Sequence, residues 1–234
     1  MQSNQAVVLA KINYDHYDLL VKLLTIHFVY PLPYSVSGAY FEELFAYVVG
    51  GQRESRKLLF DVYHNSVGWS LKTKVESSRI DFDSTFSVVL KRSDILKNRS
   101  LSLNSPAQDL GNYVIADLQN FYSISVQQQS ITDSRIAFLI RDTKERNFFL
   151  FQQRYQPYDQ SAIKWKWANE RQNSIIGYFN DIPVLSWYRR GTQTFGIYKI
   201  PPDAHKFIID WKRADLDITI EFFEQMGLVQ VIKL

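Results

Sequence analysis

Apolar residues recur at helical spacing in two stretches near the start of the chain. The first stretch predicts a helix over Tyr14–Val29. The second predicts a helix over Gly38–Val49, with Ser37 as its N-cap and Gly50-Gly51 as the pair that stops it. The stripe that this second helix should bury consists of Phe41, Leu44, Phe45 and Val48.

The pattern then changes to alternation between residues 57 and 75. Lys57–Tyr63 and Trp69–Val75 each alternate with the period of a strand, and His64–Gly68 between them has the composition of a turn. The sequence therefore predicts an antiparallel hairpin. In its first strand, one face should carry Leu58, Phe60 and Val62.

The remaining elements indicate a mixed α/β (α+β) fold. Strands are predicted over Thr85–Leu90, Arg135–Ile140 and Asn147–Gln153, and a helix runs from Pro106 to about Tyr122, followed by a polar loop over Val126–Thr132. Beyond Tyr155, short aromatic strands dominate. They are Ile163–Trp167, Ile175–Phe179, Val184–Tyr188, Phe195–Ile200 and Lys206–Ile209, before a helix at Asp215–Gln225 and a strand at Val229–Leu234.

Composition excludes several kinds of protein and of functional site. The chain has 234 residues, 46% of them hydrophobic and 15% aromatic, which suffices for a sizeable core. It contains no cysteine, so disulfides, thiolate metal sites and cysteine nucleophiles are excluded. With no signal peptide and no apolar run of about 18 residues, we expect no membrane contact and a cytoplasmic location. The net charge of +3 is compatible with DNA binding.

The predicted hairpin brings three polar residues to one face: Asp61, Ser70 and Lys72. A carboxylate at a strand end can hold Mg²⁺ through its oxygens. A neighbouring lysine can position a water or stabilise negative charge on a phosphate. This combination predicts a phosphodiester hydrolase; the alternative is a solvated face on which Asp61 and Lys72 form a weak surface pair.

The stretch resembles the core of the PD-(D/E)xK nuclease superfamily, which includes most type II restriction endonucleases. In that superfamily one strand carries an aspartate and the next carries acid-x-lysine; here Asp61 is followed after eight residues by Ser70-Leu71-Lys72. Serine replaces the acid, and no proline precedes Asp61. The resemblance covers roughly residues 37–153, in the order helix, three strands, helix, strand. It implies a restriction-endonuclease-like core over residues 1–153. Residues 154–234 would be a β-rich elaboration for DNA recognition or dimerisation, packed as part of the same domain.

The resemblance also implies roles for individual residues. Asp61 would be the central Mg²⁺ ligand, and Lys72 would orient the attacking water. Ser70 would either contact a residue that binds the metal or bind the metal through a water. Glu42, which follows a phenylalanine on the second helix, would supply the missing carboxylate. Glu76 is the weaker alternative, and Glu42 can equally be an ordinary exposed helical residue.

Two stretches of the second half are candidates for DNA contact. In Lys164-Trp165-Lys166-Trp167 the lysines share one face, which suits either phosphates or plain solvent. Arg189, Arg190 and Gln193 lie at a predicted hairpin tip, and these side chains suit guanine and adenine edges; the alternative is a set of solvated turn charges. Arg53–Arg56 and Lys97–Arg99 are the next candidates.

The expected function is that of a Mg²⁺-dependent, type II restriction-like endonuclease that cuts double-stranded DNA at a specific sequence. Because both strands must be cut, we expect a homodimer. Two alternatives stay open: a DNA-binding module without catalysis, and a structure-specific repair nuclease or resolvase.

Overall fold

The computed structural model describes residues 14–29, 36–92, 95–97, 101–102, 104–143, 147–190 and 192–209. Its first two α-helices have the predicted bounds: α1 is Tyr14–Val29 and α2 is Gly38–Val49. Ser37 caps α2 because its Oγ accepts a hydrogen bond of 3.1 Å from the backbone of Tyr40. Gly50 ends the helix in the left-handed conformation, at φ 64°.

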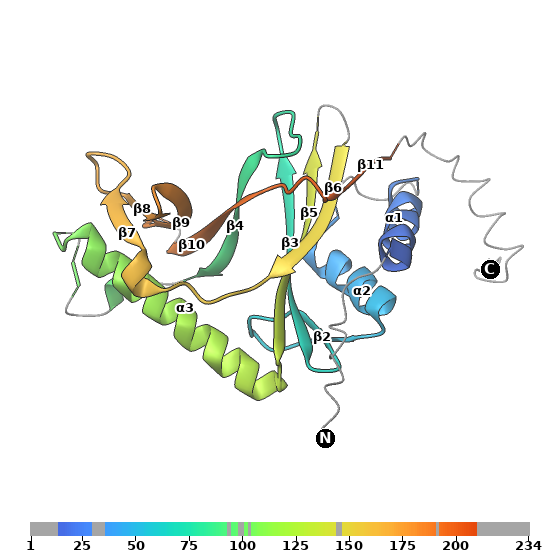
Figure 1. Ribbon diagram of the computed structural model, residues 1–234, viewed down its shortest axis with the longest axis horizontal. Coiled ribbons are helices and arrows are strands. Elements are labelled where there is room, and N and C mark those ends of the chain that lie inside the picture. The colour runs from blue at the N-terminus through green and yellow to red at the C-terminus, as the bar shows by residue number, and fades with distance from the viewer. Residues whose placement is uncertain are drawn as a thin grey trace, which may run out of the picture.

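The strands form two sheets, and the mixed α/β class is confirmed (Figure 1). In the first sheet, β3 and β5 are parallel and the other neighbours are antiparallel. Its strands, in spatial order, are β1 (Gln52–Arg53), β2 (Val62–His64), β3 (Val67–Glu76), β5 (Asp133–Asp142), β6 (Asn147–Arg154) and β11 (His205–Ile208).

The second sheet is antiparallel throughout. Its spatial order is β4 (Thr85–Arg92), β10 (Gln193–Lys199), β9 (Ile182–Tyr188), β8 (Ser174–Phe179) and β7 (Lys164–Trp167). The predicted third strand is thus β4, and it pairs with β10 of the second sheet. Conversely, β11 from the second half of the chain completes the first sheet, so each sheet takes one strand from the other half of the sequence.

Two apolar clusters hold these layers together. One lies between α3 (Ala107–Gln129) and the two sheets, and includes Leu110, Phe138 and Trp165. The other lies between α1, α2 and the opposite face of the first sheet, and includes Trp69. Short 3₁₀ helices at Ile95–Lys97 and Gln160–Ala162 complete the described elements.

The first strand of the predicted hairpin is shorter than its alternation suggests. Only Val62–His64 is strand, and the prediction that Phe60 and Val62 share a face is wrong, because Phe60 packs in the α3 cluster and Val62 in the α1–α2 cluster. The reason lies in α3. Ser125 Oγ accepts the N–H of Leu59 at 2.9 Å, and Gln129 Nε2 donates to the carbonyl of Phe60 at 3.0 Å. These side chains take backbone groups that strand pairing would otherwise use.

The same contacts explain why α3 is longer than predicted. Its last turns are polar, so the sequence indicated a loop from Val126, but the helix continues to Gln129. The buried side chains of Ser125 and Gln129 hydrogen-bond to the backbone of the segment before β2 rather than to solvent. The predicted helix at 215–225 and the strand at 229–234 lie outside the described residues.

Candidate active site and basic surfaces

The β2–β3 hairpin fixes the position of Asp61. Its two-residue turn, Asn65-Ser66, has φ values of 45° and 63°, which match the twist of antiparallel strands. The Asp61 N–H donates to the carbonyl of Trp69 at 2.9 Å, and the chain bends there. The next N–H along β3, that of Leu71, donates to Asp61 Oδ2 at 2.7 Å. The carboxylate thus takes the place of a backbone carbonyl and is held at the edge of β3.

Lys72 lies beside the same Asp61 carboxylate. Its Nζ lies 3.9 Å from Asp61 Oδ2, and the two side chains retain 17% and 25% of their exposure, so solvent reaches both groups. Burial raises the pKa of Asp61, while the Lys72 charge and the Leu71 N–H oppose that rise. The structure therefore brings together two of the predicted site residues, Asp61 and Lys72.

Glu42 lies on α2, and its negative charge adds to the raised pKa of Asp61 after the larger effect of burial. Glu42 Oε2 accepts a hydrogen bond of 2.9 Å from Arg53 Nε, and the same guanidinium binds Glu43 at 2.8 Å. An arginine of β1 thus holds this carboxylate.

Glu76 and Ser70 are placed differently. Glu76 lies five residues beyond Leu71 at the far end of β3, roughly 16 Å along the strand, and pairs with Lys74 at 3.5 Å. Ser70 is fully buried, and its Oγ has no hydrogen-bond partner among the residues that the structure describes. Of the predicted group, Asp61 and Lys72 are therefore the two that are both accessible and in contact with each other.

The residues present suit Mg²⁺ better than a metal that needs a full set of protein ligands. No group of three histidine, aspartate or glutamate side chains with metal-binding geometry occurs among the residues described. Mg²⁺ is commonly held by one or two carboxylates, with waters and substrate phosphates as its other ligands. Asp61 and Glu42 are the carboxylates that would hold such an ion, and burial is the main cause of the raised pKa of Asp61.

The lysines of β7 alternate as predicted. Lys164 and Lys166 are exposed and Trp165 is buried against α3. β7 is an edge strand, and Gln108 covers its beginning: Gln108 Oε1 accepts from the N–H of Trp165 at 3.0 Å, and Gln108 Nε2 donates to the carbonyl of Ile163 at 3.1 Å. The two exposed lysines place side-chain charge along this edge.

The predicted hairpin tip joins β9 to β10. Arg189 and Arg190 are exposed in the connection, whereas Gln193 already belongs to β10 and is partly buried. Gln193 pairs in register with Arg92 at the end of β4. The sequence analysis did not select Arg92, because only the β4–β10 register brings it beside this hairpin.

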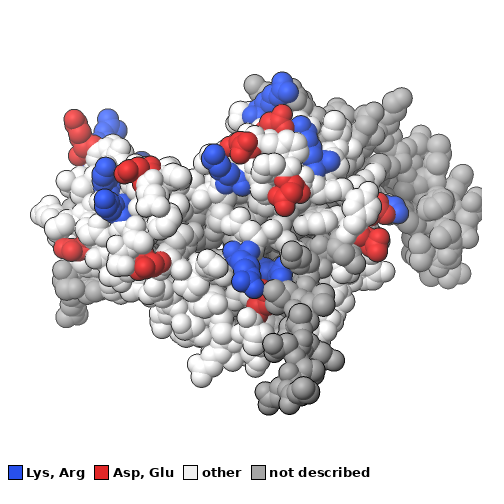
Figure 2. All heavy atoms as spheres, viewed as in Figure 1, with Lys and Arg blue, Asp and Glu red and all other residues white. Residues whose placement is uncertain are grey.

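Two of the next candidates for DNA contact, Arg53 and Arg56, are already paired with acidic side chains. Arg53 is bound by Glu42 and Glu43, and Arg56 pairs with Glu54 at 2.8 Å. The side chains of Lys97 and Arg99 lie outside the described part of the chain. Figure 2 shows that Lys and Arg side chains gather near the middle of one face, where β6 ends in Figure 1.

The chain matches no protein-family model, no curated protein and no solved structure. Within the described residues, no helix combines the length and apolar character that crossing a membrane requires. The functional argument therefore depends on the geometry of the sites themselves.

Proposed function

We propose that the protein is a Mg²⁺-dependent endonuclease that acts on double-stranded DNA, similar to a type II restriction endonuclease. One observation carries the proposal. The Lys72 ammonium lies 3.9 Å from an Asp61 carboxylate that the backbone of β3 holds in place, at a solvent-accessible position in a mixed sheet.

Asp61 and Glu42 would hold the metal ion. When bound, Mg²⁺ polarises a phosphoryl oxygen and lowers the pKa of a coordinated water. The Leu71 N–H keeps the Asp61 carboxylate oriented, and Arg53 restrains Glu42. Lys72 then has a direct role: its ammonium can hold the attacking water and offset the negative charge that develops on the phosphate.

DNA contact is assigned to the second sheet. Lys164 and Lys166 would bind phosphates, which position the duplex without reading it. Arg189, Arg190 and Gln193 would contact base edges in the major groove. Cutting both strands requires two active sites, so we propose that the enzyme is a homodimer. A cytoplasmic location would give it access to its substrate.

The test is cleavage of supercoiled plasmid in Mg²⁺ and in EDTA, by the unaltered protein and by Asp61→Ala. We expect fragments with a fixed end sequence in Mg²⁺, and none in EDTA or with Asp61→Ala. Equal cleavage by Asp61→Ala would overturn the assignment of the site. Cleavage of branched DNA but not of linear duplex would indicate a structure-specific nuclease instead.

A DNA-binding module without catalysis is the second candidate. It is favoured by the buried Ser70 at the position where the superfamily has an acid, and by Arg53, which already neutralises Glu42. Sequence-specific binding of a duplex without cleavage in Mg²⁺ or Mn²⁺ would support this candidate over the nuclease.

A further inference from the structure

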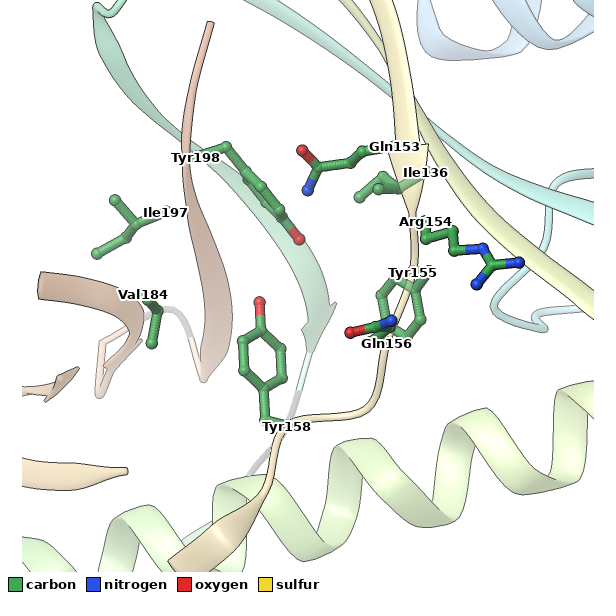
Figure 3. Close-up of a pocket in the computed structure, with 9 residues that line it drawn as sticks. All are labelled: Ile136, Gln153, Arg154, Tyr155, Gln156, Tyr158, Val184, Ile197 and Tyr198. Atoms are coloured by element: carbon green, nitrogen blue, oxygen red, sulfur yellow. The ribbon is translucent and has the colours of Figure 1, made fainter. Parts of the chain in front are cut away.

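A groove lies between the end of β6 and the second sheet, away from Asp61 (Figure 3). Its deeper part has a volume of about 280 Å³. Three tyrosines, Tyr155, Tyr158 and Tyr198, form an aromatic wall, and Val184 and Ile197 form an aliphatic one. A second cavity of about 580 Å³ shares Gln153, Val184, Ile197 and Tyr198 with the first, so the two cavities are parts of one groove.

The aromatic wall is neutral and preorganised. The hydroxyls of Tyr158 and Tyr198 point toward one another in Figure 3. Burial raises the pKa of both phenols, so neither is ionised at neutral pH. Tyr198 is further fixed by its ring contacts with Phe86 and Phe138. The aromatic wall of the groove is therefore rigid and uncharged.

The rim supplies hydrogen bonds and positive charge. Gln153 and Gln156 are exposed, and neither amide is hydrogen-bonded to another described residue; Gln153 reaches over the space beside the two hydroxyls (Figure 3). Arg154 points outward from the cavity, and Lys199 is exposed at the other part of the groove. The acid that lines the groove is Asp83.

We propose that this groove binds one unpaired nucleotide of a polynucleotide. The base would stack against the tyrosine wall, the Gln153 amide would pair with its edge, and Arg154 and Lys199 would take the flanking phosphates. A flat heterocycle with polar edges matches this combination of aromatic wall and free amides. The cationic rim favours a phosphodiester chain over a neutral or cationic ligand.

The groove and Lys72 of the candidate active site lie on the same face of the first sheet. In the strand register, Gln153 lies opposite Ile136, which lies opposite Ser70, so Gln153 and Lys72 emerge on the same face of the first sheet. Two strand spacings and two residues separate their backbones, roughly 12 Å. One strand of DNA can reach both places, and to this extent the inference rests on the proposed nuclease function.

The experiment uses a short single-stranded oligonucleotide with one 2-aminopurine, whose emission falls when it stacks on an aromatic ring. The unaltered protein should bind it in EDTA and quench its emission. Tyr198→Leu keeps apolar volume but removes the stacking surface, and should weaken binding at least about tenfold with loss of the quench. Gln153→Ala, at an exposed position, should weaken binding less but alter the preference among bases. The control is Tyr113→Leu, which removes an exposed tyrosine of α3, and it should behave like the unaltered protein.

The outcomes separate this inference from the proposed function. Quenching that depends on Tyr198 and Gln153, but not on Tyr113, supports the groove even if plasmid is never cut. Mg²⁺-dependent plasmid cleavage together with unchanged 2-aminopurine emission overturns the groove and leaves the nuclease standing. Quenching that survives both Tyr198→Leu and Gln153→Ala also overturns it. Absence of binding to any oligonucleotide, with no cleavage, overturns both.

Discussion

Two strands of this protein carry the same Lys-x-Lys alternation and use it differently. In β3, Lys72 is largely buried, at 17% exposure, beside Asp61; in β7, Lys164 and Lys166 are exposed. The difference comes from position. At Lys72, β3 pairs with β5 on one side, and on the other side β2 has ended and Asp61 hydrogen-bonds in its place; β7 is the outermost strand of the second sheet. A lysine gains a stronger, directed interaction where it is partly shielded from water beside a fixed carboxylate. The first region therefore suits chemistry, and the second suits contact with a polyanion.

The sharpest test of this comparison lies within β3. Lys72→Ala should lower the cleavage rate by about 10²–10³-fold, because it removes charge stabilisation at the reacting phosphate. Lys74→Ala is the matched control: Lys74 is two residues along the same face but pairs with Glu76 rather than Asp61. Single-turnover cleavage of a labelled duplex measures both variants. Equal losses would show that β3 contributes only general positive charge.

The hairpin tip should contribute the next largest effect. Arg189→Ala and Arg190→Ala should each cost roughly 1–3 kcal/mol in binding the preferred duplex and much less on random DNA, because a base contact exists only at the proper site. Competition binding between the preferred and a scrambled duplex gives the ratio. An unchanged ratio for both variants would remove the tip as the reading element and leave Arg92, its cross-strand neighbour, as the next residue to test.

The β7 lysines should have a smaller and uniform effect. Lys164→Ala and Lys166→Ala should weaken binding to all duplexes about equally. Each lost phosphate contact should reduce the slope of log affinity against log salt by about 0.9. Titrations at several salt concentrations measure this slope. A sequence-dependent loss would instead show that β7 reads bases.

The smallest expected effect is on stability. The pKa of Asp61 is raised above its ordinary value of 3.8, so the folded chain binds this proton more tightly than the unfolded chain does. Ionised Asp61 therefore costs folding free energy, and its contribution to stability falls as the pH rises from 3.8 through the raised pKa. Asp61→Asn should melt at a higher temperature than the unaltered protein at pH 7, and the difference should shrink as the pH is lowered. A lower melting temperature at pH 7 would mean that attraction to Lys72 outweighs burial.

Local pattern predicted most elements of this fold, and α1 and α2 even to their end residues, because caps and apolar stripes are encoded within each helix. It failed where residues distant in the sequence determine the local structure. The segment before β2 alternates like a strand, but Ser125 and Gln129 bind its backbone. For the candidate site, alternation and turn chemistry brought Asp61 and Lys72 together. The burial of Ser70 and the binding of Glu42 by Arg53 depend on tertiary packing that no short pattern contains.

Helix α3 touches both of the regions compared above. Near its start, Gln108 holds the backbone of β7; near its end, Ser125 and Gln129 hold the segment that leads into Asp61. The 21 residue steps from Gln108 to Gln129 rise about 32 Å in a continuous helix, the length of roughly nine base pairs. In the proposed nuclease, for a duplex that touches both ends, the length of this helix would set the distance from the anchoring phosphates to the cut, as a rigid ruler does. One inserted helical turn would lengthen this ruler by about 5.4 Å and displace the cut by one to two base pairs.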